Sequence, residues 1–238
     1  MKILAVLLLL LVLQPAMAYK VETHARLSQK AATCSVLAEQ SFMEGLGLEG
    51  LEAKDPLWSQ PIKKKDDESE KWFIEWIKEY KKTAYESTIK TLIGWGAKFE
   101  DEEFLSRPLN HFFDPVNGRP FHPCPFFVHC NTSPDWALED GNPRLDLDDQ
   151  GQSLFDANDR LRYALGLADK DAREQAWAGF FQSFGMVIHH IQDMSQPQHV
   201  RNDAHCDSFW CKLSGDYNPS YYEEYTNEHR KEILDQYA

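Results

Sequence analysis

Residues 170–199 read KDAREQAWAGFFQSFGMVIHHIQDMSQPQH and carry the strongest structural pattern in the chain. Apolar side chains recur along this stretch every three or four residues, which is the spacing of one helix face. The pattern predicts a helix over residues 170–194 that ends shortly before Pro197, because proline does not continue a helix. The predicted core face of this helix carries Ala176, Phe180, Phe184, Val187, Ile188 and Ile191.

The opposite face of the same helix carries an unusual pair of polar side chains. His189 and Asp193 stand four residues apart, so an imidazole and a carboxylate project from the same side. Gly185 lies one turn before them; it costs about 1 kcal/mol of helix stability relative to alanine, and a close approach of backbone or ligand would explain it. His199 follows six residues after Asp193, within reach of a neighbouring ion. Two interpretations stay open for the pair alone, a metal site and a hydrogen-bonded pair on a solvated face.

Helical patterns dominate the rest of the chain, and no segment alternates convincingly as a strand. We predict further helices over residues 23–45, with Thr23 as the cap, over 67–93, ending at Gly94 and Gly96, over 153–166 and over 221–238. The expected fold class is therefore all-α, a multi-helix single domain over residues 19–238.

Residues 97–150 differ in composition from the predicted helices. They are rich in proline, glycine, aspartate and aromatic residues, with turn signals at Asn117-Gly118 and at 140–142. We expect a long irregular loop between helices. Loops of this length inside a compact domain are usually functional.

The amino-terminal segment indicates export from the cell. Residues 1–18 combine a charged start, an apolar run and a small-residue exit, which is the pattern of a signal peptide. We therefore expect a secreted or periplasmic protein that begins at Tyr19. The apolar run is shorter than the roughly 20 residues of a membrane-spanning helix, and no later stretch approaches that length, so no transmembrane segment is expected.

Composition limits the classes of partner. The chain is 42% hydrophobic, which is enough for a packed core, and its formal net charge is -13. This charge gives no electrostatic reason to expect stable binding to nucleic acid or to an anionic membrane, although an acidic chain can hold cations. We expect a monomer.

Five cysteines lie in the exported part of the chain, where disulfides persist. Cys124 with Cys130 and Cys206 with Cys211 could each close a small loop. Cys34 would then be the odd one of the five. The sequence does not determine the connectivity.

Three motifs of the chain resemble those of a known superfamily. They are Thr23-His24, the block His111-Phe-Phe-Asp-Pro, and His189 followed by Asp193 and then by His199. With these motifs the chain resembles the superfamily of zinc-dependent phospholipases C and single-strand-specific nucleases, from residue 19 to about residue 225. The resemblance implies a trinuclear zinc site, with up to three Zn²⁺ ions, inside a helical domain.

The resemblance also implies which side chains bind the first two ions. His111, His189 and Asp193 would hold one zinc ion, and Asp193 would bridge to a second. The second ion would also take His24 and the free amine and carbonyl of Tyr19, so that removal of the signal peptide would create a ligand. An α-amine has a pKa of about 8, low enough for a divalent ion to displace its proton.

The third ion is where this sequence departs from the superfamily pattern. His199 and Glu223 match two of the ligands, but Pro219 occupies the position of an expected histidine. His205 is the obvious substitute, and Asp203 is another. We expect a third ion that is weaker or differently ligated.

The implied chemistry is hydrolysis of a phosphoric ester by a metal-bound water that attacks phosphorus in line with the leaving oxygen. Asp101 is expected to orient that water or to bind metal as well, and Glu100 is the alternative. His190 adjoins His189 but points about 100 degrees around the helix, so we expect it to pack beside the site.

Three functions remain open on the sequence. The block at His111 favours a phospholipase C-like phosphodiesterase with a lipid or small-molecule substrate. The spacing from Tyr19 to His24 favours a single-strand-specific nuclease or nucleotidase, with nucleic acid as its partner. A secreted metal-binding protein without turnover is the third. Only 15 residues follow Glu223, which indicates either a truncated chain or a core closed by fewer helices than the superfamily has.

Overall fold

A computed structural model describes residues 21–54, 87–102, 107–122, 124, 129–138, 151–203, 205 and 218–236. In this part of the chain the extended pairings are two isolated bridges, Lys54 with Thr88 and Asp114 with Arg119, so the expected all-α fold is confirmed for it. The helices are α2 (Val21–Thr33), α3 (Gln40–Gly45), α5 (Ile89–Glu102), α6 (Ser133–Leu138), α7 (Leu154–Gly166), α8 (Lys170–Asp193), α9 (Pro197–Arg201), α11 (Tyr221–Glu228) and α12 (Arg230–Gln236), with the 3-10 turns η1 (Val36–Ala38) and η4 (Arg107–Asn110).

Some of the predicted features lie outside the described residues. They are the signal peptide over 1–18, Tyr19, the first part of the helix expected over 67–93, the turn at 140–142, and the pair Cys206 and Cys211. Within the part of the chain that is described, none of the helices is both long enough and apolar enough to cross a membrane.

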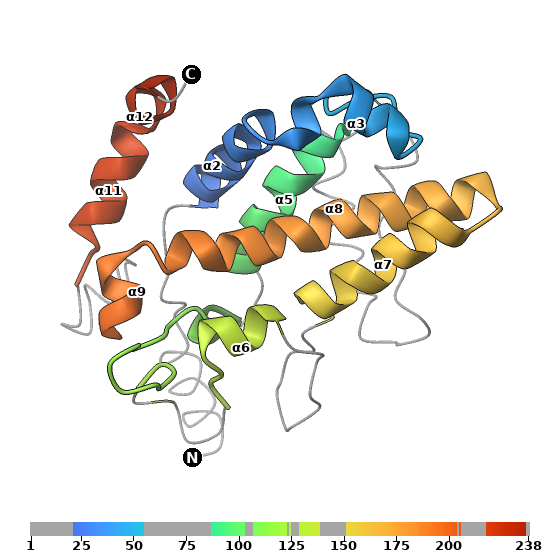
Figure 1. The fold of residues 1–238 in the computed structure, drawn as a ribbon. Coiled ribbons are helices and arrows are strands. Elements are labelled where there is room, and N and C mark those ends of the chain that lie inside the picture. The colour runs from blue at the N-terminus through green and yellow to red at the C-terminus, as the bar shows by residue number, and fades with distance from the viewer. Residues whose placement is uncertain are drawn as a thin grey trace, which may run out of the picture.

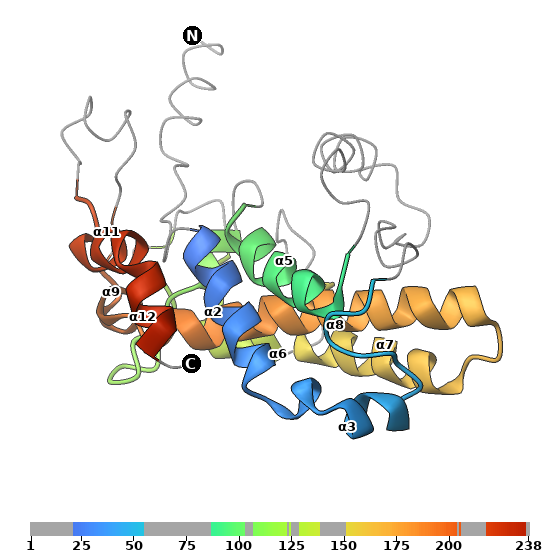
Figure 2. The same cartoon turned by 90° about the horizontal axis from the view of Figure 1, so that it is seen from above.

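α8 is the central element of the bundle. Asp169 caps its first turn by accepting a hydrogen bond from the amide of Ala172. Figures 1 and 2 show α8 running the length of the molecule, with α5 crossing it and α7 antiparallel beside it, and α2 packs on α5. The core joins Trp177, Ala178 and Phe181 of α8 to Ile89, Leu92 and Ile93 of α5.

The prediction of a single apolar core face on α8 is wrong in part. Phe184 is only half-buried and Ile191 is 67% exposed, whereas Trp177 between the predicted positions is buried. The reason is that α5, α6 and α7 all pack against α8, so more than one of its faces is covered. The polar face with His189 and Asp193 is fully buried, which excludes the alternative of a pair on a solvated face.

α5 continues through Gly94 and Gly96, where we predicted its end. It crosses α8 so closely that a Cβ on Gly96 would lie 1.9 Å from the carbonyl oxygen of Gln182. A Cβ on Gly185 of α8 would likewise lie 2.1 Å from the carbonyl oxygen of Ile93. Helix packing, rather than a helix end, therefore requires glycine here, and the close backbone approach predicted for Gly185 is confirmed.

The helix predicted over residues 23–45 is interrupted. α2 ends at Thr33, and Ser35 caps η1 by accepting a hydrogen bond from the amide of Leu37. α3 begins only after Glu39. A serine that binds the backbone locally offers it an alternative to the helix, and the helical spacing of apolar residues does not reveal this competition.

The irregular loop predicted over residues 97–150 is shorter than expected. Its first residues belong to α5, and it contains η4 and α6. The turn at Asn117-Gly118 is confirmed, because Gly118 has a φ of 62° and Asp114 accepts a hydrogen bond from the amide of Asn117.

One of the two possible disulfides lies within the described residues. Cys124 and Cys130 are joined by an S–S bond, and Cys130 is buried. The amide of Ser133, at the start of α6, donates to the carbonyl oxygen of Phe112, so this disulfide loop adjoins the His111 block. Cys34 is exposed at the end of α2.

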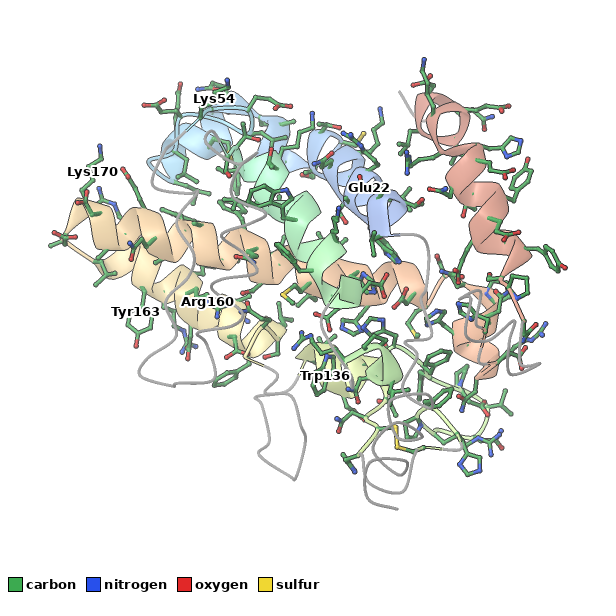
Figure 3. The ribbon with its side chains drawn as sticks, turned by 180° about the vertical axis from the view of Figure 1, so that it is seen from behind. Glu22, Lys54, Trp136, Arg160, Tyr163 and Lys170 are labelled. Atoms are coloured by element: carbon green, nitrogen blue, oxygen red, sulfur yellow. A yellow bond between two sulfur atoms is a disulfide. The ribbon has the colours of Figure 1, made fainter. Side chains whose placement is uncertain are left out.

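The two ends of α8 have different surroundings. At the end where α7 turns into α8, Tyr163 and Lys170 point away from the bundle, and Tyr163 is 61% exposed (Figure 3).

α7 follows the predicted range and is capped by Ser153. The helix predicted over residues 221–238 is divided at His229 into α11 and α12. Near the carboxyl end of α8 the candidate site residues meet.

Candidate metal centre

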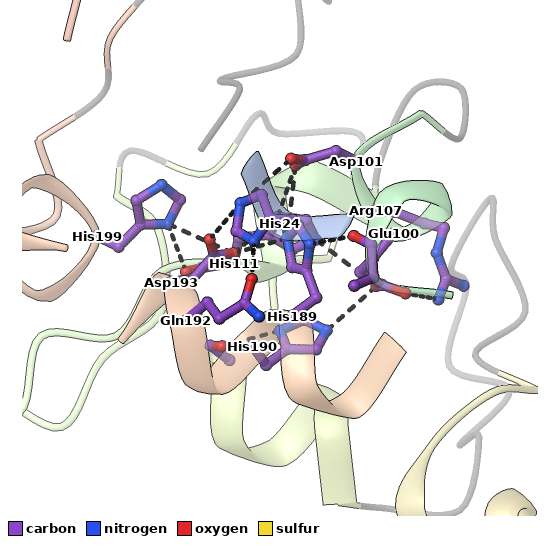
Figure 4. A network of polar contacts seen from close by, with 12 residues as sticks. His24, Glu100, Asp101, Arg107, His111, His189, His190, Gln192, Asp193 and His199 are labelled. Atoms are coloured by element: carbon purple, nitrogen blue, oxygen red, sulfur yellow. Dashed lines mark hydrogen bonds and ion pairs between the residues drawn. The ribbon is translucent and has the colours of Figure 1, made fainter. Parts of the chain in front are cut away.

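The carboxyl end of α8 brings together histidines and carboxylates from five segments (Figure 4). His189 and Asp193 come from α8, His24 from α2, Asp101 from the end of α5, His111 from the residue after η4, and His199 from α9. All six side chains are buried, none with more than 2% of its surface exposed. The structure therefore gathers six of the residues that we predicted as metal ligands or catalytic groups.

Asp193 lies between two groups of histidines. Its Oδ2 is 3.0 Å from Nε2 of His189 and 3.2 Å from Nδ1 of His111. Its Oδ1 is 3.4 Å from Nε2 of His24. A carboxylate whose two oxygens face different imidazoles has the arrangement needed to bridge two cations.

Asp101 approaches the same histidines as Asp193. Its Oδ1 is 3.3 Å from Nδ1 of His111 and 3.6 Å from Nε2 of His189, and its Oδ2 is 3.6 Å from Nε2 of His24. Asp101 therefore stands among the potential ligand atoms, which favours a direct metal-binding role for it.

A third group joins the segment around α9 to α11. His199, His205 and Glu223 offer ligand atoms that all lie within 4.8 Å of one another. Nε2 of His205 is 2.6 Å from Oε1 of Glu223, and the rings of His199 and His205 meet edge to face. The structure thus places His205 in the third group, whereas the other substitute, Asp203, pairs with Arg201.

Backbone carbonyls hold the rings of two histidines in place. Nδ1 of His189 donates to the carbonyl oxygen of Ala97 at 2.7 Å, and Nδ1 of His199 donates to that of His111 at 2.8 Å. Because a carbonyl oxygen only accepts hydrogen bonds, each ring, when neutral, carries its lone pair on Nε2. Both Nε2 atoms are thus ready to bind a cation.

His24 is held by a residue that the sequence analysis missed. Its Nδ1 lies 2.6 Å from Oε1 of Gln192, and Nε2 of Gln192 donates to Oγ of Ser28 at 2.7 Å. With this orientation of the amide, Nδ1 of His24 donates and Nε2 carries the lone pair. Gln192 precedes Asp193 in the chain, but only the approach of α2 to α8 shows what it contacts.

In these tautomers the Nε2 lone pairs of His24 and His189 face carboxylate oxygens of Asp101 and Asp193. Within the described residues, no oxygen of Asp193 or Asp101 accepts a hydrogen bond, and Nε2 of His199 has no hydrogen-bond partner. Buried acceptors that face one another are unfavourable, because neither side is compensated for its lost hydration. A cation between them would remove the repulsion, so the residues present fit a metal centre.

Burial keeps most of these imidazoles neutral. It lowers the pKa of His24, His189 and His199 to about 4 each. For His111, burial opposes the charge, but the carboxylates of Asp101 and Glu100 outweigh it and raise the pKa to about 10. A proton on His111 therefore competes with a metal ion for the same carboxylates.

Glu100 points away from its neighbour Asp101. Its Oε2 is 2.5 Å from Nη2 of Arg107, and its Oε1 accepts hydrogen bonds from Nε1 of Trp136 at 3.0 Å and from Nε2 of His190 at 3.2 Å. Figure 4 shows Glu100 and Arg107 at the opposite edge of the network from His199. The guanidinium of Arg107 already neutralises Glu100, and His190 packs here beside the site, as predicted.

Comparisons of the chain with family models, with curated proteins and with solved structures found no match. The resemblance of the three motifs therefore stays a prediction. The structure itself establishes buried groups of histidines and carboxylates that are able to hold metal ions.

Proposed function

We propose that the protein is an exported zinc-dependent hydrolase of phosphodiester bonds, similar to phospholipase C. The observation that carries the proposal is that the lone pairs of neutral, buried imidazoles face two buried carboxylates, Asp101 and Asp193. A metal ion between these lone pairs and carboxylates would compensate the buried acceptors on both sides. Imidazole and carboxylate ligands suit zinc, and the resemblance of the three motifs favours zinc among the transition metals that such ligands can hold.

The proposed ligands form three adjoining positions. His111, His189, Asp101 and Asp193 would hold the first ion, His24, Asp193 and the mature amino terminus at Tyr19 the second, and His199, His205 and Glu223 the third. The first two positions share Asp193, as expected for a site that handles a phosphoryl group with two ions.

The chemistry divides between the ions and the chain. When bound, such ions polarise phosphoryl oxygens and lower the pKa of water. The hydrogen bonds from the Nδ1 atoms of His189 and His199 keep the ligand rings oriented. The formal net charge of -13 favours a lipid or small-molecule phosphodiester over a polyanionic nucleic acid as substrate.

Elemental analysis of the mature, exported protein tests the metal centre. We expect about three zinc ions per chain, and fewer in His189→Ala because this residue contributes to the first position. His229→Ala is the matched control, because His229 lies outside the three positions. A protein that carries no metal after preparation with zinc would overturn the proposal.

Hydrolysis of bis(4-nitrophenyl) phosphate separates an enzyme from a metal-binding protein without turnover. We expect hydrolysis that a chelator abolishes, that added zinc restores, and that Asp193→Asn lacks. Phosphatidylcholine vesicles and single-stranded DNA are then compared as substrates. Preference for the lipid supports the proposal, and preference for DNA would assign the protein to the nucleases instead.

A further inference from the structure

α11 and α12 form a C-terminal arm (residues 218–236) at the edge of the bundle beside α2 (Figures 1 and 2). Among the described residues of the arm only Ser220 and Glu223 are buried, and Tyr221 and Tyr225 are 75% and 58% exposed. Burial of apolar surface is the main force that stabilises docked helices. The arm buries little apolar surface, so this force holds it only weakly to the bundle.

The buried contact between the arm and the bundle is polar. Glu223 reaches His205, which lies beside His199. His199 is completely buried, and its Nε2 has no hydrogen-bond partner within the described residues. A hydrogen bond of 3.4 Å between Oγ1 of Thr23 and Oδ1 of Asn227 adds a weaker contact. The buried side chain of the arm therefore belongs to a group of side chains that could hold a cation.

We propose that a cation held by His199, His205 and Glu223 fastens the C-terminal arm to the bundle. This inference rests on the proposed metal centre. Two of the three ligands belong to the bundle side and one belongs to the arm, because Pro219 leaves the arm without a histidine one turn before Glu223. A single side chain of the arm therefore decides whether the cation joins the two parts.

The physical basis is the cost of burying a carboxylate. Docking of the arm removes Glu223 from water, and the contact with His205 compensates this cost only in part. A metal ion shared with two imidazoles supplies the rest of that compensation. Without the ion, the arm should open locally, while α5 and α8 stay closed because they share the apolar core.

Hydrogen–deuterium exchange of the full mature protein tests this inference, with and without zinc. We expect peptides from residues 221–236 to exchange at least about tenfold faster in the metal-stripped protein, while peptides from α8 within the core change little. Glu223→Gln in the presence of zinc should exchange in the arm as the stripped protein does. Glu224→Gln, the adjacent glutamate on the same helix, should retain the protection, and His205→Ala should lose it.

Zinc content is measured in the same samples, so that the two proposals can fail separately. If zinc binds but the arm exchanges equally fast in loaded and stripped protein, the fastening is wrong and the metal centre stands. Equal protection in Glu223→Gln and wild type would overturn it in the same way. If no zinc binds, the proposed function fails and this inference fails with it. Unchanged exchange in α8 shows that each variant has folded.

Discussion

Glu100 and Asp101 are neighbours in the chain with opposite surroundings. Burial alone would raise the pKa of either carboxyl group. For Glu100 the guanidinium of Arg107 outweighs burial and holds the pKa well below its usual range, and for Asp101 His189 and His111 do the same. Successive helical residues point about 100 degrees apart, so Glu100 faces Arg107 and Nε2 of His111, whereas Asp101 faces Nδ1 of the same ring.

Glu100→Gln should destabilise the protein strongly. The substitution removes the carboxylate that pairs with the buried guanidinium of Arg107 at 2.5 Å, and removing one partner of a buried ion pair costs about 3–5 kcal/mol of the free energy of unfolding. Urea denaturation measures this. Glu22→Gln is the control, because Glu22 pairs with Lys98 at the surface and should change stability by less than about 1 kcal/mol. Similar small losses in both variants would contradict the buried pair.

Asp101→Asn should reduce zinc binding more than it reduces stability, in contrast to Glu100→Gln. The amide removes a negative charge that lies 3.3 Å from Nδ1 of His111, but Glu100 and Asp193 also face this imidazole, so the metal-free protein should lose less stability than Glu100→Gln does. Zinc content should fall, since a ligand is lost. Urea denaturation of stripped protein and elemental analysis of loaded protein measure the two effects. Retention of all the zinc would remove Asp101 from the ligands.

The crossing of α5 and α8 shows how elements build the site. Gly96 and Gly185 allow the two backbones to approach, and the approach places the carbonyl oxygen of Ala97 2.7 Å from Nδ1 of His189. The ends of the same two helices also place Asp101 and Asp193 beside the ring of His189. Close packing of two helices therefore orients a ligand of the metal centre.

Gly96→Ala should damage both packing and metal binding. The new Cβ would lie 1.9 Å from the carbonyl oxygen of Gln182, so the helices must separate, at a cost of about 1–3 kcal/mol or more. Separation lengthens the hydrogen bond from His189 to Ala97 and should weaken zinc binding. Urea denaturation and competition with a chelator measure these effects. Gly166→Ala, where a Cβ has no neighbour within 4 Å, should be nearly neutral.

At the scale of the whole molecule, the histidines make the stability of the metal-free protein depend on pH. Burial lowers the pKa of His24, His189, His190 and His199 to about 4 each. The unfolded chain takes up these protons near pH 6.5, before the folded chain does, so this stability is complete above about pH 6.5 and is lost as the pH falls toward 4. Burial raises the pKa of Glu223 to about 8, and the carboxylates around His111 raise its pKa to about 10, so the contributions of these two groups have the opposite sign.

Metal-stripped protein should therefore be less stable at pH 5 than at pH 7.5. The four neutral, buried histidines contribute less stability as the pH falls through this range, whereas only two groups, Glu223 and His111, contribute more. Urea denaturation at the two pH values measures the difference, and Asp159→Asn, at a half-buried position on α7, serves as a variant that should keep the same dependence. Greater stability at pH 5 would show that these histidines are not buried in the neutral form.

The sequence by itself determined what depends on neighbours along the chain. The helical spacing of apolar residues predicts α7 and α8 closely, and the spacing from His189 to Asp193 predicts that an imidazole and a carboxylate share one side of α8. The order of residues also predicts the small disulfide loop of Cys124 and Cys130 as one open possibility, which the structure confirms. These features follow from local geometry, which is the same in any helix or short loop.

Only the tertiary structure decided what depends on contacts between distant segments. The helical continuation of α5 through Gly96, the separation of Glu100 from Asp101, the anchoring of His24 by Gln192 and the place of His205 all required it. The physical reason is that burial and hydrogen-bond partners are set by whichever elements pack together. Spacing within one helix shows which side chains share a face, but it does not show what the face will meet.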